Sequence, residues 1–109
     1  MNIVFADDDL KKVCEDERRM TRTLGREGAK KLKARLADLE AAQVVTDVKR
    51  GNPHPLKGDR KGHFSLRLHG GYRLILECAD QPPPQFPDGA TDWSKVRGVR
   101  LLNIEDYHD

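Results

Sequence analysis

The sequence predicts an α+β fold in which a two-helix hairpin packs on one face of a small, mainly antiparallel sheet. Three observations lead to this prediction. Apolar residues recur at helical spacing in the first half of the chain, apolar and polar residues alternate in the second half, and a Gly-Gly pair separates two alternating segments. The chain has 109 residues, 37% of them hydrophobic and 35% charged. This length suits a single domain over residues 1–109, with a lean core.

The predicted helices follow one short strand. Residues 2–5 are expected to form that strand, and the aspartates at positions 7–9 are suited to cap a helix and to favour its positive end. The first helix should continue to Gly25, because glycine is a typical helix stop. The second helix is better defined, since four apolar residues recur at spacings of three and four: Ala29, Leu32, Leu36 and Leu39.

The remaining strands are expected in the second half, which gives the order β-α-α-β-β-β. Residues 63–69 alternate, Gly70-Gly71 supplies the positive φ angles of a tight turn, and strands over 72–78 and 98–104 follow. The register at the turn stays open. A two-residue turn pairs Leu68 with Arg73, whereas a loop one residue longer places Arg73 beside Arg67. In either case the face of the sheet opposite the helices is free to carry a site.

A proline-rich segment, residues 80–94, separates the last two strands. Its three consecutive prolines cannot join a sheet ladder, so we expect an exposed, extended loop held away from the sheet and anchored by Trp93. Cys14 and Cys78 are expected to be free, buried thiols. No segment resembles a signal peptide or a membrane span, so the chain is expected to be soluble, cytoplasmic and without a membrane partner.

Positive charge is concentrated in the middle of the chain. The formal net charge is only +2, but residues 49–73 hold seven Lys or Arg and one acidic residue. Such a segment is typical of a phosphate-binding surface. It contains His54, and the chain ends in Asp106, Tyr107, His108 and Asp109, which include side chains able to move protons. A cationic surface with acid/base groups indicates chemistry on a nucleic-acid backbone.

These segments together resemble the HigB-type toxins of the RelE/ParE superfamily, which are messenger-RNA interferases. The resemblance is carried by the run from His54 to Gly62, by Phe64-Ser-Leu-Arg-Leu, by Tyr72-Arg-Leu and by the terminal Asp-Tyr-His. It implies a RelE-like fold and the toxin of a type II toxin–antitoxin system. Such a toxin cleaves mRNA on the 70S ribosome and thereby inhibits translation and growth. The implied partner is a HigA-type helix-turn-helix antitoxin, and the toxin would contact DNA only indirectly, through this antitoxin. The resemblance implies no metal or other cofactor.

The resemblance also assigns residues, position by position. The catalytic set that it implies is His54, Lys57, Arg73, Asp106, Tyr107 and His108, and the RNA-binding set is Arg60, Lys61 and Arg67. Attack by a 2′-hydroxyl on the adjacent phosphate needs a base, an acid for the departing 5′-oxygen, and cations for the developing charge. The two histidines would carry protons, in an order that the sequence leaves open, while Lys57 and Arg73 would hold the phosphate. Tyr107 would stack on a base or donate its hydroxyl, and Asp106 would orient a histidine.

Structural and functional alternatives remain beside these assignments. Taken alone, His54 fits a solvated loop residue, Arg73 an internal ion pair, for example with Glu77, and the terminal residues a frayed tail. The same fold could serve a ParE-like, non-catalytic inhibitor of DNA gyrase, which would not need the acid/base groups. A third hypothesis is an RNA- or phosphate-binding module, for which the terminal tyrosine and histidine would be dispensable.

Overall fold

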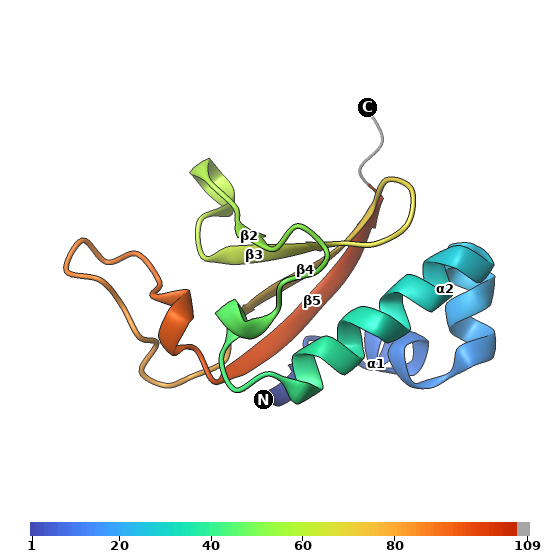
Figure 1. Ribbon diagram of the computed structural model, residues 1–109, viewed down its shortest axis with the longest axis horizontal. Coiled ribbons are helices and arrows are strands. Elements are labelled where there is room, and N and C mark those ends of the chain that lie inside the picture. Colours follow the sequence, from blue (N-terminus) through green and yellow to red (C-terminus); the bar gives the residue numbers. More distant parts are fainter. Residues whose placement is uncertain (107–109) are drawn as a thin grey trace.

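Two helices cover one face of a five-stranded sheet (Figure 1). The computed structural model describes residues 1–106. The sheet order is β1-β5-β4-β3-β2, with β1 parallel to β5 and all other neighbours antiparallel. The strands are β1 (Asn2–Phe5), β2 (His54–Pro55), β3 (His63–Arg67), β4 (Tyr72–Cys78) and β5 (Gly98–Asp106). The predicted α+β class and the two-helix layer are confirmed.

The helices are α1 (Asp8–Glu15) and α2 (Glu17–Ala41). The Asp7 carboxylate accepts a hydrogen bond from the Leu10 backbone N–H and caps α1, as the acidic run predicts. The helix expected to reach Gly25 ends at Glu15 instead, so that prediction is wrong. Asp16 adopts an extended conformation and its side chain caps the start of α2, so one residue both ends α1 and begins α2.

A kink divides α2 at Gly25. This glycine has φ 75° and ψ 174°, a conformation essentially restricted to glycine, which accounts for the predicted stop there. The kink brings the next turn close to the preceding one. A Cβ added to Gly28 would lie 2.7 Å from the Leu24 Cβ, so a second glycine is needed for this approach.

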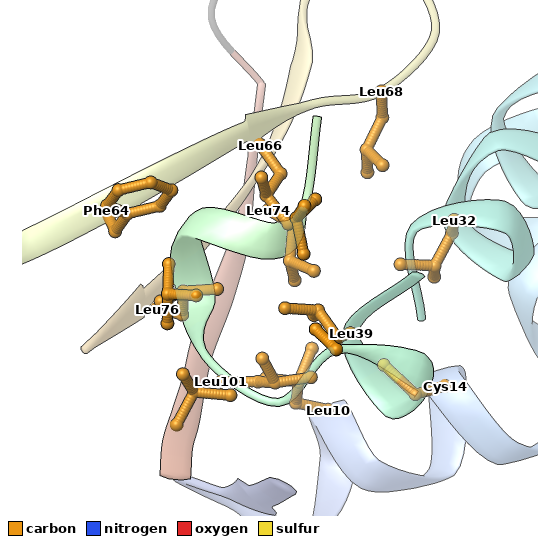
Figure 2. Close-up of a cluster of buried hydrophobic side chains, with 14 of the residues drawn as sticks. Leu10, Cys14, Leu32, Leu39, Phe64, Leu66, Leu68, Leu74, Leu76 and Leu101 are labelled. Carbon is orange, nitrogen blue, oxygen red and sulfur yellow. The ribbon is translucent and has the colours of Figure 1, made fainter. Parts of the chain in front are cut away.

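The core lies between the helices and the near face of the sheet, and it is drawn in Figure 2. Leu10 and Cys14 enter from α1, and Leu32 and Leu39 from α2. They meet the alternate residues of the strands: Phe64, Leu66, Leu68, Leu74, Leu76 and Leu101. Because strand side chains alternate between faces, the intervening residues point to the opposite side of the sheet.

Two strand boundaries differ from the sequence prediction. His54 and Pro55 form a short edge strand against β3 where a loop was expected, so the sheet has one more strand than predicted. The last strand continues to Asp106 rather than ending at Ile104, because its pairing with β4 is maintained as far as Tyr72. A bulge near Ile75 and Leu76 shifts the β4–β5 register along the way.

The hairpin register is the longer of the two alternatives. The Leu68 N–H donates to the Tyr72 carbonyl at 2.9 Å, and Arg67 lies directly opposite Arg73. Three residues, 69–71, therefore turn the chain. Arg67 and Arg73 share one face of the sheet, away from the leucines of the core.

The proline-rich segment projects beyond the end of the sheet (Figure 1). It does not stay extended, as had been predicted, but closes on itself: the Asp92 N–H donates to the Pro84 carbonyl and the Phe86 N–H to that of Ala90. Trp93 anchors its base, as predicted, by packing on Phe64 with ring centroids 4.8 Å apart. No helix within residues 1–106 is long and apolar enough to cross a membrane.

Candidate functional site

The face of the sheet that the helices leave uncovered carries, within residues 1–106, four of the nine predicted functional side chains, namely His54, Arg60, Arg67 and Arg73. Strand register also places on this side, which we call the open face, three residues that pair with one another at one end: His63, Glu77 and Arg100. Seven residues of the open face bear on the site: His54, Ser65, Arg67, Arg73, Ile75, Asn103 and Glu105. They form two rows across the strands. One row joins His54 to Asn103 through β3 and β4, and the other joins Arg67 to Glu105 through Arg73.

Two arginines converge on Glu105 at the open face. Arg60, from the turn of 3₁₀ helix at Gly58–Arg60, donates its two terminal nitrogens to the two carboxylate oxygens at 2.9 and 2.6 Å. The Arg73 Nη2 lies 3.5 Å from the same carboxylate. The two hydrogen bonds from Arg60 are the largest cause that lowers the pKa of Glu105 below its ordinary value, with the Arg73 charge adding to the effect.

Arg67 completes a group that we call the arginine cluster: Arg60, Arg67 and Arg73. Arg67 is exposed and lies directly opposite Arg73 on the neighbouring strand. Arg60 and Arg73 thus contact one carboxylate, and Arg67 adds a third positive side chain beside Arg73 in the same row. Guanidinium groups bind phosphate with the same two-pronged geometry that Arg60 shows toward Glu105, so the cluster is suited to hold a phosphodiester.

His54 lies on the same face, in the neighbouring row. Its Nδ1 is 2.7 Å from the Asn52 carbonyl oxygen, which can only accept a hydrogen bond. Nδ1 is therefore the protonated nitrogen in this geometry, and in a neutral ring Nε2 carries the free lone pair. Strand spacing puts the Cα atoms of His54 and Arg73 roughly 12 Å apart, a span that a phosphodiester with its flanking sugars can bridge.

Lys57 and Lys61 lie outside this group. Both are exposed and flank the turn that carries Arg60. They line a groove together with Trp93, which packs on the core residue Phe64. The structure thus brings Arg60 to Arg73 but leaves the two lysines at the edge of the sheet.

The predicted terminal residues are only partly described. Asp106 pairs with Tyr72 at the end of β5, so strand alternation places it on the opposite side of the sheet from Glu105 and Arg73. Tyr72 packs against the core, which agrees with this assignment. The strand was expected to end at Ile104, but it continues to Asp106, so Asp106 does not fold back over the open face. Tyr107 and His108 lie outside the described residues.

Glu105 is the residue that sequence reasoning missed. The predicted partner of Arg73 was Glu77, but Glu77 pairs with Arg100 at 2.9 Å and approaches His63 at 4.0 Å. The β4–β5 register would have identified Glu105 as the residue opposite Arg73, but a bulge makes that register unreadable from sequence. Within residues 1–106, no three His, Cys, Asp or Glu side chains gather as metal ligands would.

Comparison with known proteins places the chain among bacterial toxins. The family described as the RelE-like toxin of type II toxin-antitoxin system HigB matches residues 3–82, almost three quarters of the chain. The chain belongs to this family of HigB-like toxins. The match ends at the start of the proline-rich segment, so the rest of that loop and β5 lie beyond it.

Individual relatives agree with the family. The endoribonuclease HigB of Proteus vulgaris is 31% identical over 75 residues, and the match covers 64% of each protein. Among solved structures, a YoeB/ParE toxin from Agrobacterium tumefaciens superposes with a TM-score of 0.60 at 14% identity, over the full length of both chains. The YoeB–YefM complex from Staphylococcus aureus gives a TM-score of 0.57 at 18% identity, over 100% of this chain and 98% of that one. At these identities the structural matches establish the RelE-like fold of this HigB-like toxin.

Proposed function

We propose that this HigB-like toxin is a single-domain, cytoplasmic endoribonuclease that cleaves mRNA on the 70S ribosome and so stops translation and growth. The observation that carries the proposal is the convergence of Arg60 and Arg73 on one anion at the open face, with His54 on the same face. The name of the Proteus vulgaris relative supports the same activity. A HigA-type antitoxin is the proposed partner, as one structural relative was solved in complex with YefM.

The proposed reaction is attack of an RNA 2′-hydroxyl on the adjacent phosphorus, with departure of the 5′-oxygen. His54 Nε2 accepts the 2′-hydroxyl proton, since Nδ1 is held by the Asn52 carbonyl. Arg73 and Arg60 bind the phosphate oxygens and stabilise the negative charge that grows on them, after the phosphate displaces Glu105. The nucleophile comes from the substrate itself, so these steps need no metal or other cofactor.

The remaining predicted residues have supporting roles in this proposal. Arg67, Lys57 and Lys61 bind neighbouring phosphates along the message. His108 or Tyr107 donates the proton to the leaving oxygen, and Asp106 orients the tail. We also propose that the ribosome positions the message, because holding the 2′-hydroxyl in line with the phosphate requires the message to be fixed in place.

Expression in cells tests the cleavage proposal. His54→Ala should abolish both growth arrest and new mRNA 5′ ends, whereas His69→Ala, at the exposed turn between β3 and β4, should retain both. The purified protein should cleave a message only when 70S ribosomes are added. Equal mRNA cleavage by the two variants would contradict the proposal. Growth arrest with intact mRNA and lost gyrase activity would establish the ParE-like alternative instead.

A further inference from the structure

The loop that lies mostly beyond the family match forms one wall of an apolar groove. The groove has a volume of about 580 Å³ and lies between the basic turn that follows β2 and the proline-rich segment. Pro55 and Leu56 form one wall, and Phe86 and Ala90 form the other, with Trp93 also in the lining. A volume of this size accommodates one or two large side chains.

Phe86 marks this groove as a contact surface. Its side chain is 51% exposed, and among residues 1–106 only Val4, at 37%, is another exposed large apolar residue. The loop that presents it is closed by backbone hydrogen bonds and anchored by Trp93 on Phe64. Phe86 adjoins the apolar lining of the groove, and an apolar surface that continues over several residues is typical of an interaction site.

The charged residues that line the groove indicate the charge of the partner that would bind there. Lys57 and Lys61 line it and are both exposed. Asp92 is the one acidic residue among its described lining residues, and it is buried, with its carboxylate accepting hydrogen bonds from the Ser94 N–H and hydroxyl. The exposed charges in the lining are thus both positive and the interior is apolar, which complements an acidic segment with an apolar anchor.

A peptide fits this surface better than a nucleobase. A base inserted here would place its ring nitrogens and carbonyls against Pro55, Leu56 and Ala90 without hydrogen-bond partners. The backbone N–H groups of Phe86 and Asp92 are already used within the loop. The groove also involves Pro55 and Trp93, which lie beside the core residue Phe64, whereas His54 and Arg73 are on the open face.

We propose that this groove is the docking site for an acidic, extended segment of a protein partner, which inserts a large apolar side chain between Phe86 and Trp93. The site lies outside the arginine cluster and does not depend on the proposed mRNA cleavage, although its two lysines, Lys57 and Lys61, are also those proposed to bind phosphates of the message. A partner bound in the groove would contact a surface of the toxin that is not part of the open face.

Titration of the full chain with three probes, followed by ¹H–¹⁵N correlation spectra, tests this proposal. The probes are the acetylated peptide Glu-Glu-Leu-Glu-Phe-Glu-Leu-Glu-Glu, its counterpart with lysine for every glutamate, and a single-stranded RNA of equal length. The acidic peptide should shift the indole signal of Trp93, the single tryptophan, together with the Ala90 and Thr91 amides. Phe86→Ser should weaken this binding by at least about tenfold, as loss of an aromatic anchor does.

Matched controls separate this site from the proposed active site. Val4→Ser removes the other exposed large apolar side chain and should leave peptide binding unchanged. Phe86→Ser should retain wild-type mRNA cleavage on ribosomes. The proposal is overturned if no peptide shifts these signals at millimolar concentration, if the lysine peptide binds as tightly, or if Phe86→Ser binds like wild type. Shifts caused by RNA alone would assign the groove to the RNA path and overturn it as well.

Discussion

Glu105→Gln should weaken the fold while strengthening RNA binding. In the free protein this carboxylate receives two hydrogen bonds from Arg60 and lies 3.5 Å from Arg73. The side chains of Glu105, Arg60 and Arg73 are 21%, 35% and 16% exposed. Solvent therefore screens this interaction less than it screens an ion pair on the surface. Glutamine keeps one acceptor oxygen but introduces an amide donor that opposes the guanidinium of Arg60.

The expected cost is about 1–2 kcal/mol, the range for charge-assisted hydrogen bonds that are partly solvated. For a domain of this size that corresponds to a decrease in Tm of roughly 5–10 °C. The pH dependence has a definite sign. Because the folded-state pKa of Glu105 is lowered, its contribution is fully present above the ordinary value of 4.5 and is lost as the pH falls through the folded-state value. The stability difference between wild type and variant should therefore shrink at acidic pH.

RNA binding should change in the opposite direction. Replacing Glu105 removes the carboxylate that competes with phosphate for Arg60 and Arg73, so a short single-stranded RNA should bind more tightly. The dependence of log affinity on log salt should steepen by roughly 0.7 for each additional phosphate contact. Glu77→Gln is the matched control, since Glu77 lies on the same face but pairs with Arg100. Fluorescence anisotropy measures the affinity, and an unchanged or weaker affinity for Glu105→Gln would refute the competition between carboxylate and phosphate.

Three further predictions concern the scaffold. Gly25→Ala should destabilise the protein by about 1–3 kcal/mol in urea unfolding, because a backbone with φ 75° and ψ 174° strains any side chain. The control Thr23→Ala, at an exposed position of the same helix, should not destabilise it, and equal urea midpoints for the two variants would contradict the kink. Ser65→Ala should be neutral or stabilising by up to ~1 kcal/mol, since the Ser65 hydroxyl is buried without a hydrogen-bond partner among the described residues. A clear loss of stability in the same urea unfolding experiment would reveal a partner. Burial raises the pKa of the Cys14 thiol to about 11. At pH 8 a thiol reagent should therefore modify the half-buried Cys78 first, and faster labelling of Cys14 would contradict its packing in the core.

The elements that the sequence predicted well are those with a strong local signal. The leucines of α2 and the alternating residues of β3 bury one side of each element, so periodicity identified both. The break at Asp16 was missed because an aspartate fits a helical surface as well as a cap. The two-residue strand at His54–Pro55 was missed because it contains proline and is defined by its pairing with β3 rather than by any pattern of its own.

The candidate site depends on contacts between residues far apart in the chain. Arg60 and Glu105 are separated by 45 positions, and neither shows a local feature that announces their pairing. Arg60 was predicted only as a contact to the RNA backbone, yet its side chain binds Glu105, the carboxylate that Arg73 also approaches. The position of Asp106 depends on where the last strand ends: the strand continues two residues past Ile104, and strand alternation then places Asp106 on the side opposite Glu105.

The rate of mRNA cleavage on programmed 70S ribosomes tests the central claim most directly, namely that the open face is the site of RNA cleavage. Arg73→Ala should reduce the single-turnover rate by about 100-fold or more, the usual effect of removing one group that stabilises transition-state charge. Arg97→Ala removes an exposed arginine outside the open face and should cleave at the wild-type rate. If a correctly folded Arg73→Ala variant cleaves the message as fast as Arg97→Ala, the open face is not the active site.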